Sequence, residues 1–211
     1  KHGSKCFVGL QKRYAPSYQS LKSEVKSAQH YSLTYRVGAY PEGDALFDLY
    51  IHAIDLAVFL FGAGDIQSLQ MAGGGDTLLL HLKHQSGTIG SLELSTAYSW
   101  EGAEESLEII TDKAHISVDG TREVLSTKCT SKLAGIPLEK VRKFTPEQRI
   151  LWRQSSFLPV AEHNQLIAAG YFGELDNFIQ FCETGKASLN QSSPASLKPT
   201  YRLLEAVGKQ P

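Results

Sequence analysis

Alternating apolar and polar residues mark the middle of the chain as a series of short strands. In residues 31–37 the apolar side chains fall at every second position, which would bury one side of a strand. Asp119-Gly120 is a typical two-residue hairpin turn between two later strands. Short connections and one-sided alternation predict a mostly antiparallel sheet with one covered face. The further strands are expected at 66–71, 77–83, 88–96, 106–111, 115–118 and 123–126.

Helical patterns lie on both sides of this strand-rich region. The clearest covers residues 44–62, which begins at Gly43-Asp44 and ends at Gly62. A run of strands flanked by helices is typical of an α+β fold, with helices packed on one face of an open sheet. The remaining elements are expected as a strand at 6–10, helices at 16–26 and 192–209, a short helix around 146–152, and a long or broken helix at 162–184.

The composition excludes several classes of protein. The chain of 211 residues is 42% hydrophobic and 20% charged, with a formal net charge of −1, so it has enough apolar material for a core and no basic excess for nucleic-acid binding. No apolar run is long enough to span a membrane. Three cysteines lie far apart and are expected to be free thiols. We therefore expect a cytoplasmic protein without nucleic-acid or membrane partners.

The helix at 44–62 also carries the strongest chemical signal. At 100° per residue, Asp48, His52 and Asp55 fall within about 60° of one another on its surface. The rest of the helix is apolar, so it should be largely buried. Buried carboxylates and imidazoles are costly unless they are paired or face a cavity. A carboxylate one turn before a histidine can hold the ring and tune its proton affinity, which suits proton transfer.

Other interpretations of the same three side chains stay open. They could be a solvated stripe, or His52 could make a structural hydrogen bond in the core. Asp48, His52 and Asp55 could instead bind zinc or iron in a metal-dependent enzyme. The sequence has neither the Gly-x-Ser-x-Gly motif of a hydrolase nor a glycine-rich dinucleotide fingerprint.

Several segments resemble the Gfo/Idh/MocA oxidoreductase family. FDLYIHAIDLAVFLFG, at residues 47–62, resembles the family's Asp-x-Gly-x-His-x-x-Asp helix, and FVGLQKRYAPSYQSLK resembles its domain junction. Three later segments match in the same order along the chain. Within the family, the opening and the short loop before the helix are most similar to the MviM-like virulence-factor branch. The later segments are ESLEIITDKAHISVDG, YFGELDNFIQFCETGK and SSPASLKPTYRLLEAVGKQ.

The resemblance implies a fold and a domain organisation. Residues 1–211 would be a single substrate and oligomerisation domain, with the C-terminal fold of dihydrodipicolinate reductase. Residues 1–27 would be the junction strand and helix from an N-terminal Rossmann domain that is missing here. That domain would bind NAD or NADP and supply a lysine from a Glu-Lys-Pro motif. The isolated chain is expected to be an inactive fragment with no bound cofactor.

The resemblance also assigns roles to residues. His52 would be the general acid/base for a sugar, polyol or related hydroxy substrate, and Asp48 would orient that substrate. Arg13 and Tyr14 would lie on the nicotinamide side of the cleft, and Asp55 would close a polar contact behind the site.

One residue departs from the family pattern. Tyr50 replaces the usual glycine, so its ring would either narrow the pocket or pack outward. Tyr50, His163 and Tyr171 are candidate substrate contacts. The alternative to an enzyme is a non-catalytic binding or oligomerisation module. In either case the uncovered sheet face would form a homodimer or a higher oligomer.

Overall fold

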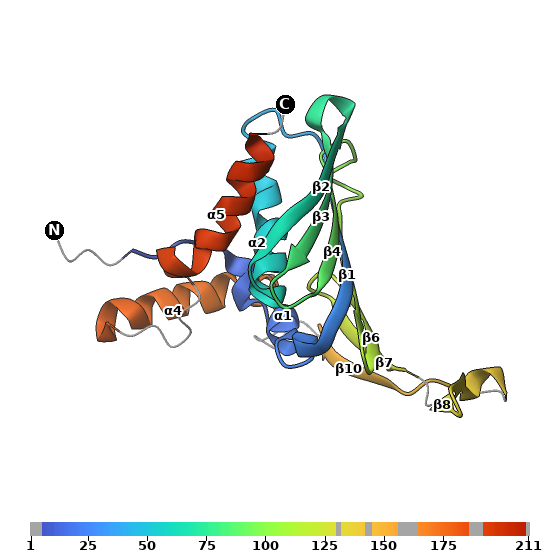
Figure 1. Cartoon of the computed structure of the whole chain (residues 1–211). Coiled ribbons are helices and arrows are strands. Elements are labelled where there is room, and N and C mark those ends of the chain that lie inside the picture. The colour runs from blue at the N-terminus through green and yellow to red at the C-terminus, as the bar shows by residue number, and fades with distance from the viewer. Residues whose placement is uncertain (1–5, 130–131, 142–144, 156–163, 186–191, 210–211) are drawn as a thin grey trace.

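A computed structural model describes residues 6–129, 132–141, 145–155, 164–185 and 192–209. Its centre is an eight-stranded sheet in the order β10-β7-β6-β5-β1-β4-β3-β2 (Figure 1). Only the β1–β4 pair is parallel, so the prediction of a mostly antiparallel open sheet is confirmed. The strands are β1 (Ala28–Arg36), β2 (Gly64–Ala72), β3 (Thr77–His84), β4 (Ile89–Ser95), β5 (Glu104–Thr111), β6 (Ala114–Asp119), β7 (Glu123–Lys128) and β10 (Gln148–Arg153), with a separate pair β8 (Lys132–Leu133) and β9 (Ile136–Pro137).

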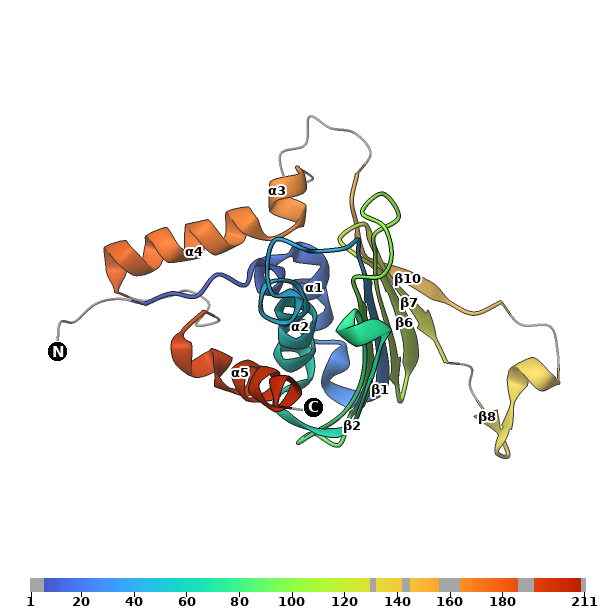
Figure 2. The same ribbon diagram turned by 90° about the horizontal axis from the view of Figure 1, so that it is seen from above.

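The helices pack on one face of this sheet, as Figure 2 shows for α1, α2 and α5. The helix expected at 44–62 begins with a π-helical turn, η3, and continues as α2. The helices are α1 (Pro16–Leu21), α2 (Ile51–Phe61), α3 (Gln165–Ala168), α4 (Tyr171–Thr184) and α5 (Pro194–Gly208), with η3 (Leu46–Tyr50) and the short 3-10 turns η1 (Gln11–Tyr14), η2 (Val25–Ser27), η4 (Gly73–Gly75) and η5 (Leu138–Lys140).

The core lies between α2 and the covered sheet face. Strand positions that alternate toward the helices are almost completely buried, which is the one-sided pattern that the sequence predicts. Tyr31 of β1 illustrates how tightly this layer packs: its ring stacks on Phe61 with centroids 4.1 Å apart, and its hydroxyl lies 2.8 Å from His84 Nε2. A Cβ at Gly90 would lie 2.0 Å from the Tyr31 ring, so the strand needs glycine there. Leu78, Leu80, Leu82, Leu92, Leu94, Leu107 and Ile109 complete the layer.

Three predicted elements are wrong or altered. Residues 6–10 form no strand; Val8 donates one backbone hydrogen bond to Ser192 (3.0 Å), and the chain then enters η1. The helix at 16–26 ends at Leu21. Residues 148–153 are strand β10 instead of part of a helix, because pairing with β7 overrides the local preference.

The expected break in the helix at 162–184 does occur. Gly170 has φ of +94° and separates α3 from α4. Its backbone lies so close to η1 that an added Cβ would be 2.0 Å from the carbonyl oxygen of Gln11. This close approach ties the start of α4 to η1.

Candidate functional site

His52 sits on α2 with its imidazole partly buried. Burial and the positive charge of Lys12 lower the pKa of His52, and the carboxylates of Asp55 and Glu105 oppose this shift. Its Nδ1 atom is buried and has no hydrogen-bond partner. The neutral imidazole is therefore favoured near neutral pH, which is the form that can accept a proton.

A charged cluster lies beside His52. Lys12 of η1 forms an ion pair with Glu105 of β5, and the Tyr18 hydroxyl donates a hydrogen bond to the same carboxylate. The Lys12 and Glu105 side chains are only 15% and 19% exposed. Burial alone would raise the pKa of Glu105, but the charge of Lys12 and the two hydrogen bonds outweigh it and lower that pKa. The cluster thus holds a fixed cation and a fixed anion near the imidazole.

Two tyrosines complete this side of the domain. The Lys12 Nζ atom lies 5.4 Å from the ring centroid of Tyr35, on β1. Burial raises the pKa of Tyr35 to about 12, with smaller contributions from Glu105 and Tyr171. Tyr171, a predicted substrate contact, is half exposed at the start of α4, and Gln11 Nε2 donates to its hydroxyl over 3.4 Å. Tyr171 is therefore near the His52 cluster and open to solvent.

The expected pairing of Asp48 with His52 is wrong. Asp48 is exposed, and its carboxylate accepts a hydrogen bond from the backbone N–H of Asp44 (3.0 Å). Asp48 lies within the π-helical turn η3, in which the N–H of Ile51 bonds to the carbonyl of Leu46. The Asp48 carboxylate is therefore engaged at the start of the helical segment and not at the imidazole. π-Helical turns are frequent at functional sites, so the turn is itself a feature of the candidate site.

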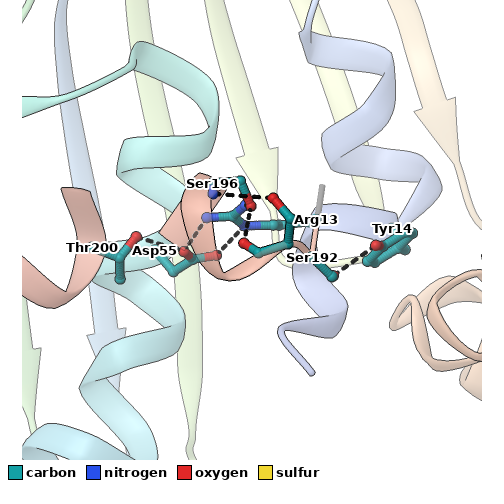
Figure 3. A network of polar contacts seen from close by, with 7 residues as sticks. Arg13, Tyr14, Asp55, Ser192, Ser196 and Thr200 are labelled. Carbon is teal, nitrogen blue, oxygen red and sulfur yellow. Dashed lines mark hydrogen bonds and ion pairs between the residues drawn. The ribbon is translucent and has the colours of Figure 1, made fainter. Parts of the chain in front are cut away.

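Asp55 belongs to a separate buried network, which Figure 3 shows with Arg13 reaching from η1 to α2. Arg13 donates two hydrogen bonds to the Asp55 carboxylate, at 2.7 Å from Nε and 2.5 Å from Nη2. Thr200 of α5 donates to the same carboxylate over 2.7 Å, and Arg13 also donates to Ser196 over 3.3 Å. The network therefore ties η1, α2 and α5 together behind His52, as expected for Asp55.

Two other predicted site residues are buried. Tyr14 has its hydroxyl 2.7 Å from Ser192 Oγ, and burial raises its pKa. Tyr50 donates from its hydroxyl to the carbonyl of Asp76 (2.8 Å), so its ring packs inward, against the β2–β3 turn. There it lines a cavity of about 220 Å³ between η3, the β2–β3 turn and the end of α5. His163 lies outside the described residues.

A metal site formed by Asp48, His52 and Asp55 receives no support. Asp55 is bonded to Arg13 and Thr200, while Asp48 is bonded at the helix start. Across the parts of the chain that the structure describes, no three histidine, cysteine or acidic side chains are close enough to hold a metal ion.

Sequence reasoning missed Lys12, Tyr18, Tyr35 and Glu105. A signal for Glu105 was present, because it shares the alternation of Leu107 and Ile109 and therefore lies on the covered face of β5. A carboxylate at such a position needs a partner. Nothing in the local pattern indicated that this partner would be Lys12, 93 residues earlier.

Comparisons with known proteins agree with this fold. Residues 24–117 match the sequence model of the GFO/IDH/MocA C-terminal domain. No curated protein sequence matches the chain. None of the helices in the described ranges combines the length and apolar character that a membrane crossing requires.

Three solved structures illustrate the structural similarity. The dehydrogenase MviM from Clostridium difficile has a TM-score of 0.70 at 16% identity, over 95% of this chain and 60% of that one. An oxidoreductase from Agrobacterium radiobacter, in complex with NAD+, L-tartaric acid and magnesium, has a TM-score of 0.66 at 17% identity, over 96% and 61%. Levoglucosan dehydrogenase, in complex with NADH and L-sorbose, has a TM-score of 0.67 at 14% identity, over 95% and 62%. The chain thus spans less than two thirds of each protein.

Proposed function

We propose that this chain is the substrate-side half of an NAD(P)-dependent oxidoreductase, because residues 24–117 match the sequence model of the GFO/IDH/MocA C-terminal domain. The substrate would be a sugar, a polyol or a related hydroxy compound. Similar structures hold NAD+ with L-tartaric acid and NADH with L-sorbose, which supports this class of reaction. The observation that carries the proposal is His52, which is held partly buried and largely neutral beside a charged cluster.

In the proposed reaction the imidazole of His52 takes the proton of the substrate hydroxyl. The carbon that carries this hydroxyl loses a hydride, and a carbonyl forms. The nicotinamide, when bound by the N-terminal domain, supplies the hydride acceptor. In the reverse direction the imidazolium returns the proton to the carbonyl oxygen. Asp48 is exposed and Tyr171 is half exposed, and both are proposed to orient the substrate.

Arg13 and Tyr14 would act from behind the site. Both side chains are buried within this domain, and Arg13 is bonded to Asp55. We therefore place their contribution in holding η1, and Lys12 with it, against α2. Direct contact of either residue with the nicotinamide stays a prediction.

The surface of α4 fits the proposed N-terminal domain as a partner. This helix projects away from the sheet (Figure 2). Its exposed side carries Tyr171, Phe172, Leu175 and Ile179, all at least 46% exposed. Contiguous exposed apolar side chains are typical of interaction sites. The residues before η1 run beside this helix, with the rings of Phe7 and Phe178 5.3 Å apart, so a preceding domain would start next to it.

The uncovered sheet face is the proposed contact with a second copy of the chain. This face lies opposite the helices (Figure 1). It presents the exposed apolar side chains of Leu79 and Ile89, together with exposed polar neighbours such as His81 and Lys83. Light scattering of the full-length protein over a range of concentrations tests this contact. A dimer or higher oligomer that Leu79→Glu dissociates would support it, whereas a monomer at all concentrations would contradict it.

The proposed reaction is tested with the full-length protein and both dinucleotides. Binding of NAD+ and NADP+ is measured by calorimetry, and formation of reduced nicotinamide is followed with a panel of hydroxy compounds. The panel includes L-tartaric acid, levoglucosan and L-sorbose, taken from the similar structures. We expect binding of one dinucleotide and its reduction by at least one sugar or polyol. A protein that binds neither dinucleotide would contradict the proposal.

A further inference from the structure

Two exposed aromatic side chains lie on the loop that joins β4 to β5. Tyr98 and Trp100 are 57% and 53% exposed, and a single residue separates them along the chain. Tyrosine and tryptophan give a ligand a large contact area, because each offers a broad apolar ring with one polar atom at its edge. This loop is therefore a candidate binding surface that the proposed reaction does not use.

Both rings are held in place by close contact with a glycine. The indole of Trp100 lies on Gly38, where an added Cβ would be 2.3 Å from the Cδ1 atom, and its Nε1 donates to the carbonyl of Ala39 over 3.0 Å. The ring of Tyr98 lies against Gly102, whose added Cβ would be 3.4 Å from the Cε1 atom. A ring that is fixed before binding loses little conformational entropy when a ligand covers it. The two side chains are thus preorganised for a contact.

The loop is joined to the segment that follows β1. β1 and β4 are parallel neighbours, so the chain leaves both strands at the same end of the sheet. The backbone N–H of Val37 bonds to the carbonyl of Ser95 over 2.8 Å, and the N–H of Tyr98 bonds to the carbonyl of Val37 over 3.0 Å. The loop therefore stands beside residues 37–45, which lead directly into η3.

Residues 38–43 connect the rings to Asp48, a proposed substrate contact. The indole of Trp100 packs on the first residue of this segment. At its other end, an added Cβ at Gly43 would be 2.3 Å from Asp48 Oδ2 and 2.8 Å from the Tyr40 ring, so the carboxylate and the phenol meet at the same glycine. A ligand that is hydrogen-bonded to Asp48 can therefore extend along this segment to the exposed rings.

The charges around the rings favour an uncharged ligand that is rich in hydroxyl groups. Segments 37–48 and 96–105 contain six carboxylates and no lysine, arginine or histidine. Glu104 and Glu105 are paired with Arg36 and Lys12, while the other four form no ion pair with any residue that the structure describes. Such carboxylates repel phosphates, but they accept hydrogen bonds from sugar hydroxyls. The four are Glu42, Asp44, Asp48 and Glu101.

We propose that Tyr98 and Trp100 form a second sugar-binding subsite, on which an uncharged sugar ring stacks while a hydroxyl of the neighbouring ring reacts at His52. The apolar C–H face of a sugar ring covers the aromatic ring, and its hydroxyls reach the carboxylates around it. The inference rests on the proposed function, because it names the class of substrate for the same site. That class is an uncharged glycoside of at least two rings.

Calorimetry with the full-length protein tests this subsite without any turnover. The probes are cellobiose, maltose and lactose, with glucose as the single ring, UDP-glucose as the charged sugar, and tetramethylammonium because aromatic rings also attract cations. At least one disaccharide should bind more tightly than glucose, UDP-glucose and tetramethylammonium. The inference is overturned if no disaccharide binds more tightly than glucose, or if UDP-glucose or tetramethylammonium binds more tightly than every disaccharide.

Variants of the rings locate the subsite. Trp100→Ala should weaken binding of the disaccharide about tenfold or more, as truncation of an aromatic anchor does. Trp100→Phe keeps a ring and should recover most of the affinity. Tyr201→Ala removes a tyrosine of α5 that is 41% exposed, and this matched control should have no effect. Equal affinities for Trp100→Ala and Tyr201→Ala would overturn the inference, and Tyr98→Ala provides the same test if Trp100→Ala does not fold.

NMR shows whether the sugar touches the indole. The Nε1–H signal of Trp100 is identified by its loss in Trp100→Phe. This signal should shift as the disaccharide is added, whereas that of Trp152, which donates to the carbonyl of Thr121, should stay in place. A Trp100 signal that does not move at saturating disaccharide would overturn the inference.

Kinetics separate failure of the subsite from failure of the proposed function. For a disaccharide that is oxidised, Trp100→Ala should raise KM and leave kcat near the wild-type value, because the stacked ring is bound equally in the ground state and the transition state. If disaccharides bind as expected but no hydroxy compound is oxidised with either dinucleotide, the proposed function fails while the subsite stands. If single-ring sugars are oxidised but no disaccharide binds, the subsite fails while the proposed function stands.

Discussion

The buried Arg13–Asp55 pair offers the sharpest test of how the site is held together. Its side chains are 3% and 1% exposed, and the carboxylate also accepts from Thr200, which is fully buried. Asp55→Asn keeps the shape of the side chain but leaves the guanidinium buried without its counter-charge. Removing one partner of such a pair typically costs about 3–5 kcal/mol. We expect Asp55→Asn to lower the free energy of unfolding by that amount.

The matched control is an ion pair on the surface. Lys128 and Glu147 are 67% and 72% exposed, and their nitrogen and oxygen lie 3.2 Å apart. Water screens this pair, so Glu147→Gln should cost about 0–1 kcal/mol. Thr200→Val is a milder change at the buried site and should cost about 1–3 kcal/mol, because it leaves a buried acceptor without one donor.

Urea unfolding followed by circular dichroism measures all three variants, provided that each slope with denaturant stays near the wild-type value. The double variant Arg13→Met/Asp55→Leu should lower the free energy of unfolding by less than the sum of the losses in Arg13→Met and Asp55→Leu measured separately. The reason is that each single variant leaves one buried charge unpaired, whereas the double variant leaves none. If Asp55→Asn and Glu147→Gln cost the same, the pair does not hold η1 against α2, and the reasoning is refuted.

Two further predictions concern the core and the start of α4. Burial lowers the pKa of His84 below its ordinary 6.5. The unfolded chain therefore binds a proton more readily, and the free energy of unfolding should fall as the pH drops below that value. In urea titrations between neutral and mildly acidic pH, a His84→Gln variant should show a shallower fall, and an unchanged slope would contradict this. Gly170→Ala adds a Cβ 2.0 Å from a backbone oxygen at a residue with positive φ, so in thermal unfolding it should lower the free energy of unfolding by well over roughly 1 kcal/mol. Gly185→Ala is the control, with an expected loss of roughly 1 kcal/mol, because Gly185 has φ of +72° but nothing near the added Cβ. Equal losses would contradict the close approach.

The sheet could be predicted because its information is local. Leu92 and Leu94 alternate with polar residues, and that period alone places them on one face. The strand β10 was missed for the opposite reason. Its residues have no clear period, and they form a strand because β7 offers an edge that lies far away in the sequence.

The site was predicted only in part, because its geometry depends on a local irregularity and on distant contacts. Helical spacing predicts that Asp48 holds His52, but the Asp48 carboxylate lies in the π turn η3 and accepts a hydrogen bond from the N–H of Asp44 instead. The importance of His52 could be inferred from a polar residue on an apolar helix. Its neighbours Lys12 and Glu105 come from η1 and β5, and only the folded chain brings them together.

The account depends most directly on His52 as the acid/base of the full-length enzyme. The measurement is kcat for His52→Ala beside His81→Ala, an exposed histidine on β3 whose Nδ1 lies 2.7 Å from Ser68 Oγ. Loss of a general acid/base typically lowers the rate by about 10²–10⁴-fold, and we expect a decrease of that size for His52→Ala with little change for His81→Ala. A His52→Ala enzyme that turns over as fast as the wild type would contradict the account.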